Sequence, residues 1–85
     1  MKEEQAVAVQ RFYLTYSTDK IKEPVIYHAG HKFAVVTNIR SASISDHVGL
    51  VGLELEGEQD EIERAVAWIA KQDIKVEPIE KNVIE

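Results

Sequence analysis

Apolar and polar positions alternate with a period of two in four stretches of this chain, and they follow a helical period in two others. The first alternating stretch, Ala6–Tyr16, is rich in aromatic and β-branched residues, which predicts a half-buried strand. Pro24 suits the first turn of a helix, where its missing N–H costs nothing, and helical spacing follows it. These features predict a helix over about Glu23–Lys32.

The next apolar stretch, Ala34–Ile44, predicts a second strand, but its alternation is broken. Its apolar residues divide between the two parities: Val36, Ala42 and Ile44 on one, Val35 and Ile39 on the other. A β-bulge between the two sets is one explanation. The other is that both faces of the strand are partly covered, as at a dimer interface. The sequence leaves both open.

The second half of the chain repeats the plan of the first. Val48–Glu56 alternates as a strand that forms a hairpin with the preceding one, and Glu58–Gln72 has the clearest helical stripe. A last strand from Ile74 ends at Pro78. The order strand, helix, strand, strand, helix, strand predicts an α+β fold, the ferredoxin-like βαββαβ sandwich. Its four-stranded antiparallel sheet would carry two helices on one face.

Composition narrows the class. The chain has 85 residues, which indicates one domain, and 45% of them are hydrophobic, which is typical of a globular protein. A net charge of -5 argues against binding nucleic acid, and no segment reads as a signal peptide or membrane span. No cysteine is present, which excludes disulfides, thiolate metal sites and cysteine nucleophiles. We therefore expect a cytoplasmic protein without a membrane partner.

No constellation of residues indicates catalysis. The carboxylates of the Glu54–Glu63 region alternate outward or line an exposed helix, and no nucleophile–base pair or phosphate loop is present. His28 and His31 have the spacing to approach one metal, but no acidic or thiol ligand accompanies them. We expect no enzyme, no metal and no cofactor.

Asn38 is the residue that most needs an explanation. It interrupts an apolar strand, where asparagine is disfavoured because its amide competes for local backbone hydrogen bonds. Its amide either serves a ligand or partner, or satisfies the backbone at a bulge. Arg40, two residues on, has a side chain that can hold a carboxylate, or it is a solvated residue that discourages edge pairing.

The motif Asn38-Ile39-Arg40 resembles the Asn-Ile-Leu signature of the NIL domain family. Further pieces of the resemblance stand in order along the chain: Lys22-Glu23-Pro24, Gly49 with Leu53-Glu54-Leu55-Glu56-Gly57, Ala67-Trp68-Ile69 and Val76-Glu77-Pro78. The resemblance covers about Arg11 to Ile79. It implies a domain over residues 6–79 with flexible termini at 1–5 and 80–85.

The resemblance also implies a function. NIL domains are similar in fold to the amino-acid-sensing ACT domains. In methionine-importing ATPases they dimerise, bind methionine near the dimer interface and inhibit transport. The signature asparagine of that site matches Asn38, and two apolar pocket positions match Ile44 and Val51. The resemblance thus predicts a ligand site at Asn38, Ile39, Arg40, Ile44 and Val51 in a homodimeric, non-catalytic sensor of a methionine-like sulfur amino acid.

The chain departs from the transporter domains in two ways: Arg40 stands where the signature has Leu, and the hairpin after Ile44 is shorter. The form Asn38-Ile39-Arg40, together with Lys22-Glu23-Pro24-Val25-Ile26-Tyr27, is more similar to a second branch of the family. In the second branch a NIL domain precedes an iron–sulfur ferredoxin module and is linked to sulfur assimilation. The alternative function is therefore a docking module for such a ferredoxin or another sulfur-metabolism partner, with no ligand of its own. The chain would be a stand-alone relative or one domain of a larger protein.

Overall fold

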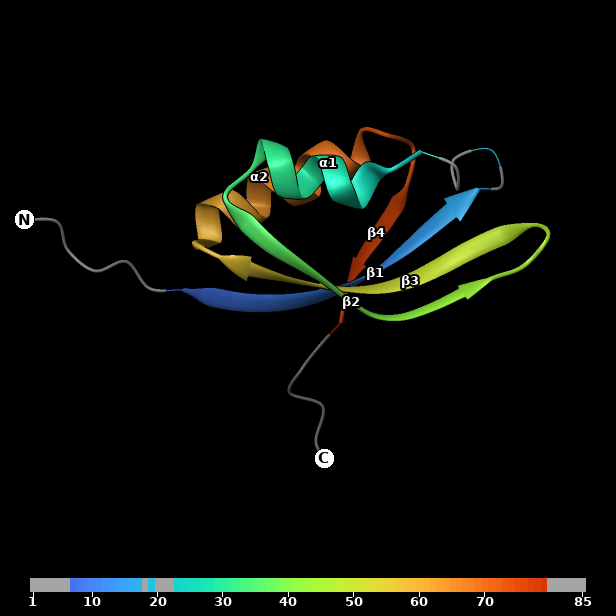
Figure 1. Ribbon diagram of the computed structural model, residues 1–85, viewed down its shortest axis with the longest axis horizontal. Helices are drawn as coiled ribbons and strands as arrows, with labels where there is room; N and C mark the ends of the chain where they lie inside the picture. Colours follow the sequence, from blue (N-terminus) through green and yellow to red (C-terminus); the bar gives the residue numbers. More distant parts are fainter. Residues whose placement is uncertain (1–6, 18, 20–22, 80–85) are drawn as a thin grey trace, which may run out of the picture.

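The computed structural model describes residues 7–17, 19 and 23–79, and these form the predicted order of elements. Along the chain the six elements are β1 (Ala8–Ser17), α1 (Val25–Lys32), β2 (Val35–Ile44), β3 (Val48–Gly57), α2 (Gln59–Ala70) and β4 (Lys75–Pro78). The four strands form one antiparallel sheet in the order β2-β3-β1-β4, and both helices cover the same face of it (Figure 1). The predicted ferredoxin-like α+β fold is confirmed.

The sheet therefore has two unlike faces, which we call the helix face and the open face. The helix face carries the buried side chains of β1 and β3, and these pack against both helices. The core consists of thirteen buried residues: Phe12, Leu14, Tyr16, Val25, Ala29, Val35, Val51, Leu53, Leu55, Ile62, Ala65, Ile69 and Ile74. The hairpin of β2 and β3 extends beyond the helices, so its far end lacks this cover (Figure 1).

A β-bulge in β2 explains the broken alternation of that strand. The register against β3 shifts between Ile39 and Ser41, so Arg40 is the extra residue. Before the shift Ile39 lies opposite Leu53, and after it Ala42 lies opposite Val51. Because Leu53 and Val51 both face the helices, the bulge returns Ala42 to the helix face. Of the two explanations for the mixed parity, the bulge is confirmed.

The helix ends differ slightly from the predicted ones. α1 begins at Val25 rather than Glu23, and Pro24 occupies the N-cap position instead of the first turn. The carbonyl of Glu23 accepts a hydrogen bond from the Val25 amide at 2.8 Å, in a tight turn that precedes the helix. The predicted start of β1 at Ala6 lies outside the described residues.

The N-terminal part of α2 is tied to the start of β2. The backbone N–H of Ala34 donates to the Glu61 carboxylate at 2.9 Å, across 27 residues of sequence. At the same end of the sheet, a Cβ on Gly57 would lie 2.7 Å from the Ala34 carbonyl oxygen. The close approach of two backbones therefore requires glycine at position 57. Within the described residues, no helix is long and apolar enough to cross a membrane.

A pair of glycine substitutions tests this packing. Gly57→Ala should lower the free energy of unfolding by about 1–3 kcal/mol, because the new methyl group displaces the Ala34 backbone. Gly30→Ala is the matched control, since its Cβ would make ordinary contacts with the Thr37 side chain in an α1 interior position. It should raise stability by about 0.5–1 kcal/mol. Urea denaturation measures the change in the free energy of unfolding for each variant. Equal changes in the two variants would contradict the prediction.

Candidate functional site

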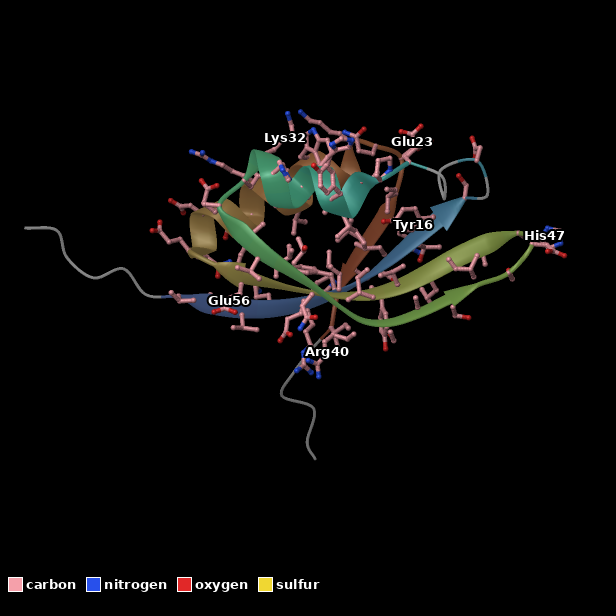
Figure 2. All side chains as sticks on the ribbon, in the orientation of Figure 1. Tyr16, Glu23, Lys32, Arg40, His47 and Glu56 are labelled. Carbon is pink, nitrogen blue, oxygen red and sulfur yellow. The ribbon has the colours of Figure 1, made fainter. Side chains whose placement is uncertain are left out.

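The structure places the five predicted site residues on both faces of the sheet. Asn38 lies opposite Glu54 on the open face, and Arg40 contacts Glu54 there. Ile39 and Ile44 lie on the helix face with Val51. Their partners on β3 are Leu53 and Gly49, and both of these positions are buried. Figure 2 shows Arg40 projecting from the sheet on the side away from the helices. One copy of the chain therefore brings Ile44 and Val51 together, but not with Asn38 and Arg40.

Ile44 and Val51 line a cavity of about 190 Å³ between the start of α1 and the hairpin, which we call the α1 pocket. Ile39 shares their face but does not line this pocket. The lining is mostly apolar and comes from four elements and the turn before α1: Tyr16, Glu23, Pro24, Val25, Ile26, Tyr27, Ile44, Gly49 and Val51. This volume is below the roughly 300–1,000 Å³ of pockets for drug-sized ligands. The α1 pocket therefore suits a group the size of one amino-acid side chain.

The α1 pocket has polar groups at its edge. The N-terminus of α1 has no side-chain cap, and its first turn holds no acidic residue. Helix N-terminal amides and the helix dipole favour a negative group at such a position. Glu23, which is exposed, supplies a carboxylate beside it. Figure 2 shows Tyr16 and Glu23 on the helix side of the sheet. An anionic and a cationic group could thus be held at one end of an apolar slot.

Tyr16 forms part of the wall of the α1 pocket. Its side chain is only 6% exposed, and this burial raises the pKa of the Tyr16 phenol because the phenolate would lose its hydration. The raised pKa keeps the phenol neutral in the folded chain to higher pH than in the unfolded chain.

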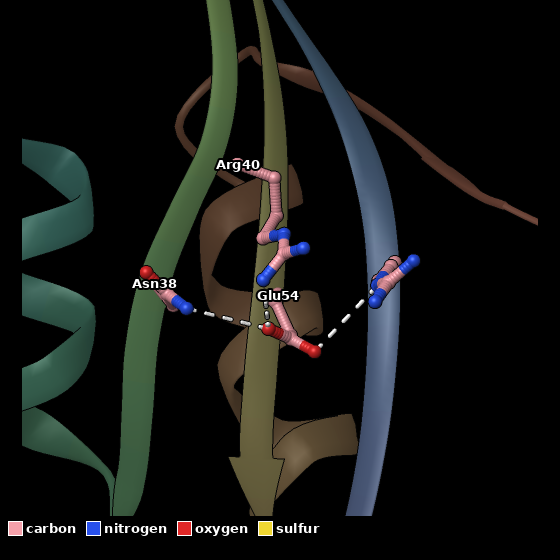
Figure 3. A network of polar contacts seen from close by, with 4 residues as sticks. Asn38, Arg40 and Glu54 are labelled. Atoms are coloured by element: carbon pink, nitrogen blue, oxygen red, sulfur yellow. Dashed lines mark hydrogen bonds and ion pairs between the residues drawn. The ribbon is translucent and has the colours of Figure 1, made fainter.

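On the open face, polar side chains converge on Glu54 (Figure 3). The Asn38 amide donates to Oε1 of Glu54 at 3.4 Å, and Arg40 Nη1 lies 3.5 Å from the same oxygen. Arg11 Nε, from β1, lies 3.5 Å from Oε2. The Glu54 side chain is only 15% exposed, whereas those of Arg11 and Arg40 are about half exposed. Glu54 is thus held between two strands by three donors.

This arrangement changes the explanation of Asn38. The expected alternatives were a ligand contact or an amide that satisfies the backbone at a bulge. The bulge is at Arg40, and the Asn38 amide donates to the Glu54 side chain, not to backbone. Asn38 therefore helps to orient a carboxylate on the neighbouring strand. Its role in a ligand site stays a prediction.

The histidines of α1 pack against an aromatic ring. The Tyr27 ring lies 5.4 Å from that of His28 and 4.3 Å from that of His31, measured between centroids. In the part of the chain that the structure describes, no three side chains of the metal-binding types converge.

Sequence reasoning missed several pocket residues. The sequence places Tyr16 at the end of a half-buried strand and Glu23 at the start of a helix, and it gives no link from either to Ile44 and Val51. Only the pairing of β1 with β3, which sets Tyr16 opposite Gly49, reveals that link. Arg11 was likewise missed as a partner of Glu54. The alternation of β1 and β3 put both on outward faces, but the register between the strands was needed to pair them.

Comparison with known proteins supports the family. A family model described as the NIL domain matches residues 10–78, which is most of the chain. A comparison with curated proteins gave no match. The family match, together with the fold, identifies a small regulatory or binding module.

The burial of Tyr16 predicts a pH dependence. The unfolded chain loses its phenolic proton near pH 10, whereas the folded chain keeps it to higher pH. The free energy of unfolding should therefore fall as pH rises above about 10. In Tyr16→Phe the free energy of unfolding should fall less steeply above this pH than in the wild type. Tyr13→Phe changes a more exposed ring on the open face, and its free energy of unfolding should fall as in the wild type. Denaturation curves between pH 8 and about 11 check this, and parallel curves for wild type and Tyr16→Phe would contradict it.

Proposed function

The chain belongs to the NIL domain family, and from this premise we propose that it is a non-catalytic regulatory module that binds a methionine-like amino acid in the α1 pocket. The observation that carries the proposal is the cavity itself. Ile44 and Val51, which the family resemblance assigns to a thioether slot, line one small apolar pocket although they are seven positions apart in the sequence. The volume fits an unbranched side chain.

The edge of the α1 pocket complements the other groups of an amino acid. An α-carboxylate would lie at the uncapped N-terminus of α1, where the helix dipole and the free amides attract it. An α-ammonium would pair with the carboxylate of Glu23. The thioether would then contact Tyr16, Ile44 and Val51. Each part of the ligand has a partner of matching chemistry, and this supports an amino acid over a simple hydrocarbon.

Asn38 and Arg40 enter this proposal only through a second copy. In the same protomer they lie on the open face, with the sheet between them and the α1 pocket. The proposed homodimer would have to bring the open face of one copy near the ligand of the other. The effect of Asn38→Ala on ligand affinity therefore reports whether a second copy contributes to the site.

A titration tests the proposal. Addition of methionine to the protein should give saturable amide NMR shifts at Val25, Ile44 and Val51. Homocysteine, cysteine, S-adenosylmethionine and norleucine form the comparison panel, in which norleucine keeps the shape of methionine without its sulfur. S-adenosylmethionine should bind least, because the cavity is too small for a nucleoside. No response to any member at millimolar concentration would overturn the amino-acid proposal.

A matched pair of β2 variants localises the site. Ile44→Trp places an indole in the α1 pocket and should weaken methionine binding at least about tenfold, which corresponds to about 1.4 kcal/mol. Val36→Trp introduces the same residue at an exposed position of β2 on the open face, outside the α1 pocket, and should weaken binding less than Ile44→Trp does. Equal affinities of the two variants would place the ligand elsewhere. Size-exclusion chromatography with light scattering would measure the proposed dimer separately.

One observation favours the alternative, a protein-docking module. The open face carries exposed apolar side chains along its length, from Val9 and Val36 at one end, through Tyr13, to Leu50 and Val48 near the hairpin turn. Such a surface fits a protein partner better than a free amino acid. A module of this kind would give no response in the amino-acid titration, so the same experiment separates the two functions.

A further inference from the structure

A second hollow lies on the open face, on the other side of the sheet from the α1 pocket. It has a volume of about 200 Å³ and is lined by Arg11, Tyr13, Arg40, Ser41, Gly52 and Ile79. Two of the three arginines of this acidic chain are in that lining, and the third, Arg64, is on α2. We call it the arginine hollow.

The bulge and a glycine create the arginine hollow. Because Arg40 is the inserted residue, Arg40 and Ser41 both lie on the open face beside Gly52 of β3. A Cβ on Gly52 would lie 2.6 Å from Ser41 Oγ and 3.8 Å from the Tyr13 ring. The Ser41 hydroxyl therefore occupies the place that a side chain at position 52 would need, and Ser41 and Gly52 together form part of the wall of the hollow.

The two arginines have donors that Glu54 does not occupy. Each guanidinium carries five N–H donors, and in the described residues each has one nitrogen within ion-pair distance of Glu54, at 3.5 Å. Neither contact is the short, bidentate pair that arginine forms with a well-aligned carboxylate. With two positive groups and one negative group, the cluster has a net charge of +1. Two further carboxylates lie on this face: Glu77 of β4, whose Oε2 is 3.7 Å from Lys75 Nζ, and Glu56 of β3, which lies opposite Val9 and Val36.

We propose that the arginine hollow binds one oxyanion group, a carboxylate or a phosphate, of a small molecule. Arg11 and Arg40 would supply the charge, and the hydroxyls of Tyr13 and Ser41 would supply neutral donors. Gly52, which has no side chain to project into the hollow, would line the site. This site is independent of the α1 pocket, because the sheet separates the two.

Arginine side-chain NMR tests the proposal on the full chain. Inorganic phosphate and succinate are titrated separately into the protein at constant ionic strength set with sodium chloride, and the Nε–Hε signals of the three arginines are followed. The Nε–Hε signals of Arg11 and Arg40 should shift along a saturable curve with at least one anion, and the anion that gives saturation shows whether the site prefers a phosphate or a carboxylate. The signal of Arg64 should respond weakly and linearly. Arg64 is the internal control, since it also pairs with one carboxylate, Glu61, at 3.3 Å. Equal, linear responses of all three arginines would overturn the proposal.

Three variants sharpen the test. Arg40→Leu should abolish the saturable shift of Arg11, while the backbone amide spectrum confirms that the fold is retained. Glu54→Gln should tighten binding about three- to fivefold, because one negative charge is removed at a distance of a few ångströms from the anion. Arg64→Gln should leave the affinity unchanged. Unaltered anion binding in both Arg40→Leu and Glu54→Gln would exclude this hollow as the site.

Discussion

Both candidate sites of this domain depend on one inserted residue in β2. The strand supplies the edge of the sheet, and its side chains alternate between a face covered by helices and a face that is open. Without the insertion at Arg40, Ile44 would face away from α1, and the α1 pocket would lose part of its wall. With it, Val35 at one end of the strand and Ile44 at the other both face the helices. A single bulge thus lets one strand serve both the core and the pocket.

The same insertion shapes the open face. Two adjacent residues, Arg40 and Ser41, come to lie on that side, where regular alternation would allow one. Both meet Gly52, which has no side chain to collide with Ser41. The ion pairs around Glu54 involve half-exposed arginines, and pairs of this kind contribute only about 0–1 kcal/mol each to stability. The cluster therefore matters more for charge and shape on this face than for holding the sheet together.

The fold could be predicted from the sequence because its signals are local. The alternation of Phe12, Leu14 and Tyr16, the helical stripe after Gln59 and the stop at Pro78 each depend on a few neighbouring residues. The site could be predicted only in part. Ile44 and Val51 came from the family resemblance, and the structure places both in one pocket. Tyr16 and Glu23 could not be added, because their proximity to Ile44 depends on strand register and on the path of the chain into α1.

The bulge explains why Ile44 lies on the opposite face of the sheet from Asn38 and Arg40. In the sequence, Asn38, Arg40 and Ile44 are all an even number of residues apart, so a regular strand would put all three on one face. The extra residue reverses the parity after Arg40 and sends Ile44 to the other side. Motif residues that are close in sequence can therefore lie on different surfaces.

For Asn38 the consequence within one molecule is structural: its amide orients Glu54, and Glu54 in turn holds one nitrogen of Arg11 and one of Arg40. Within one molecule, Asn38 therefore orients a charged side chain of the open face. A contact between Asn38 and a ligand in the α1 pocket requires a second molecule of the protein.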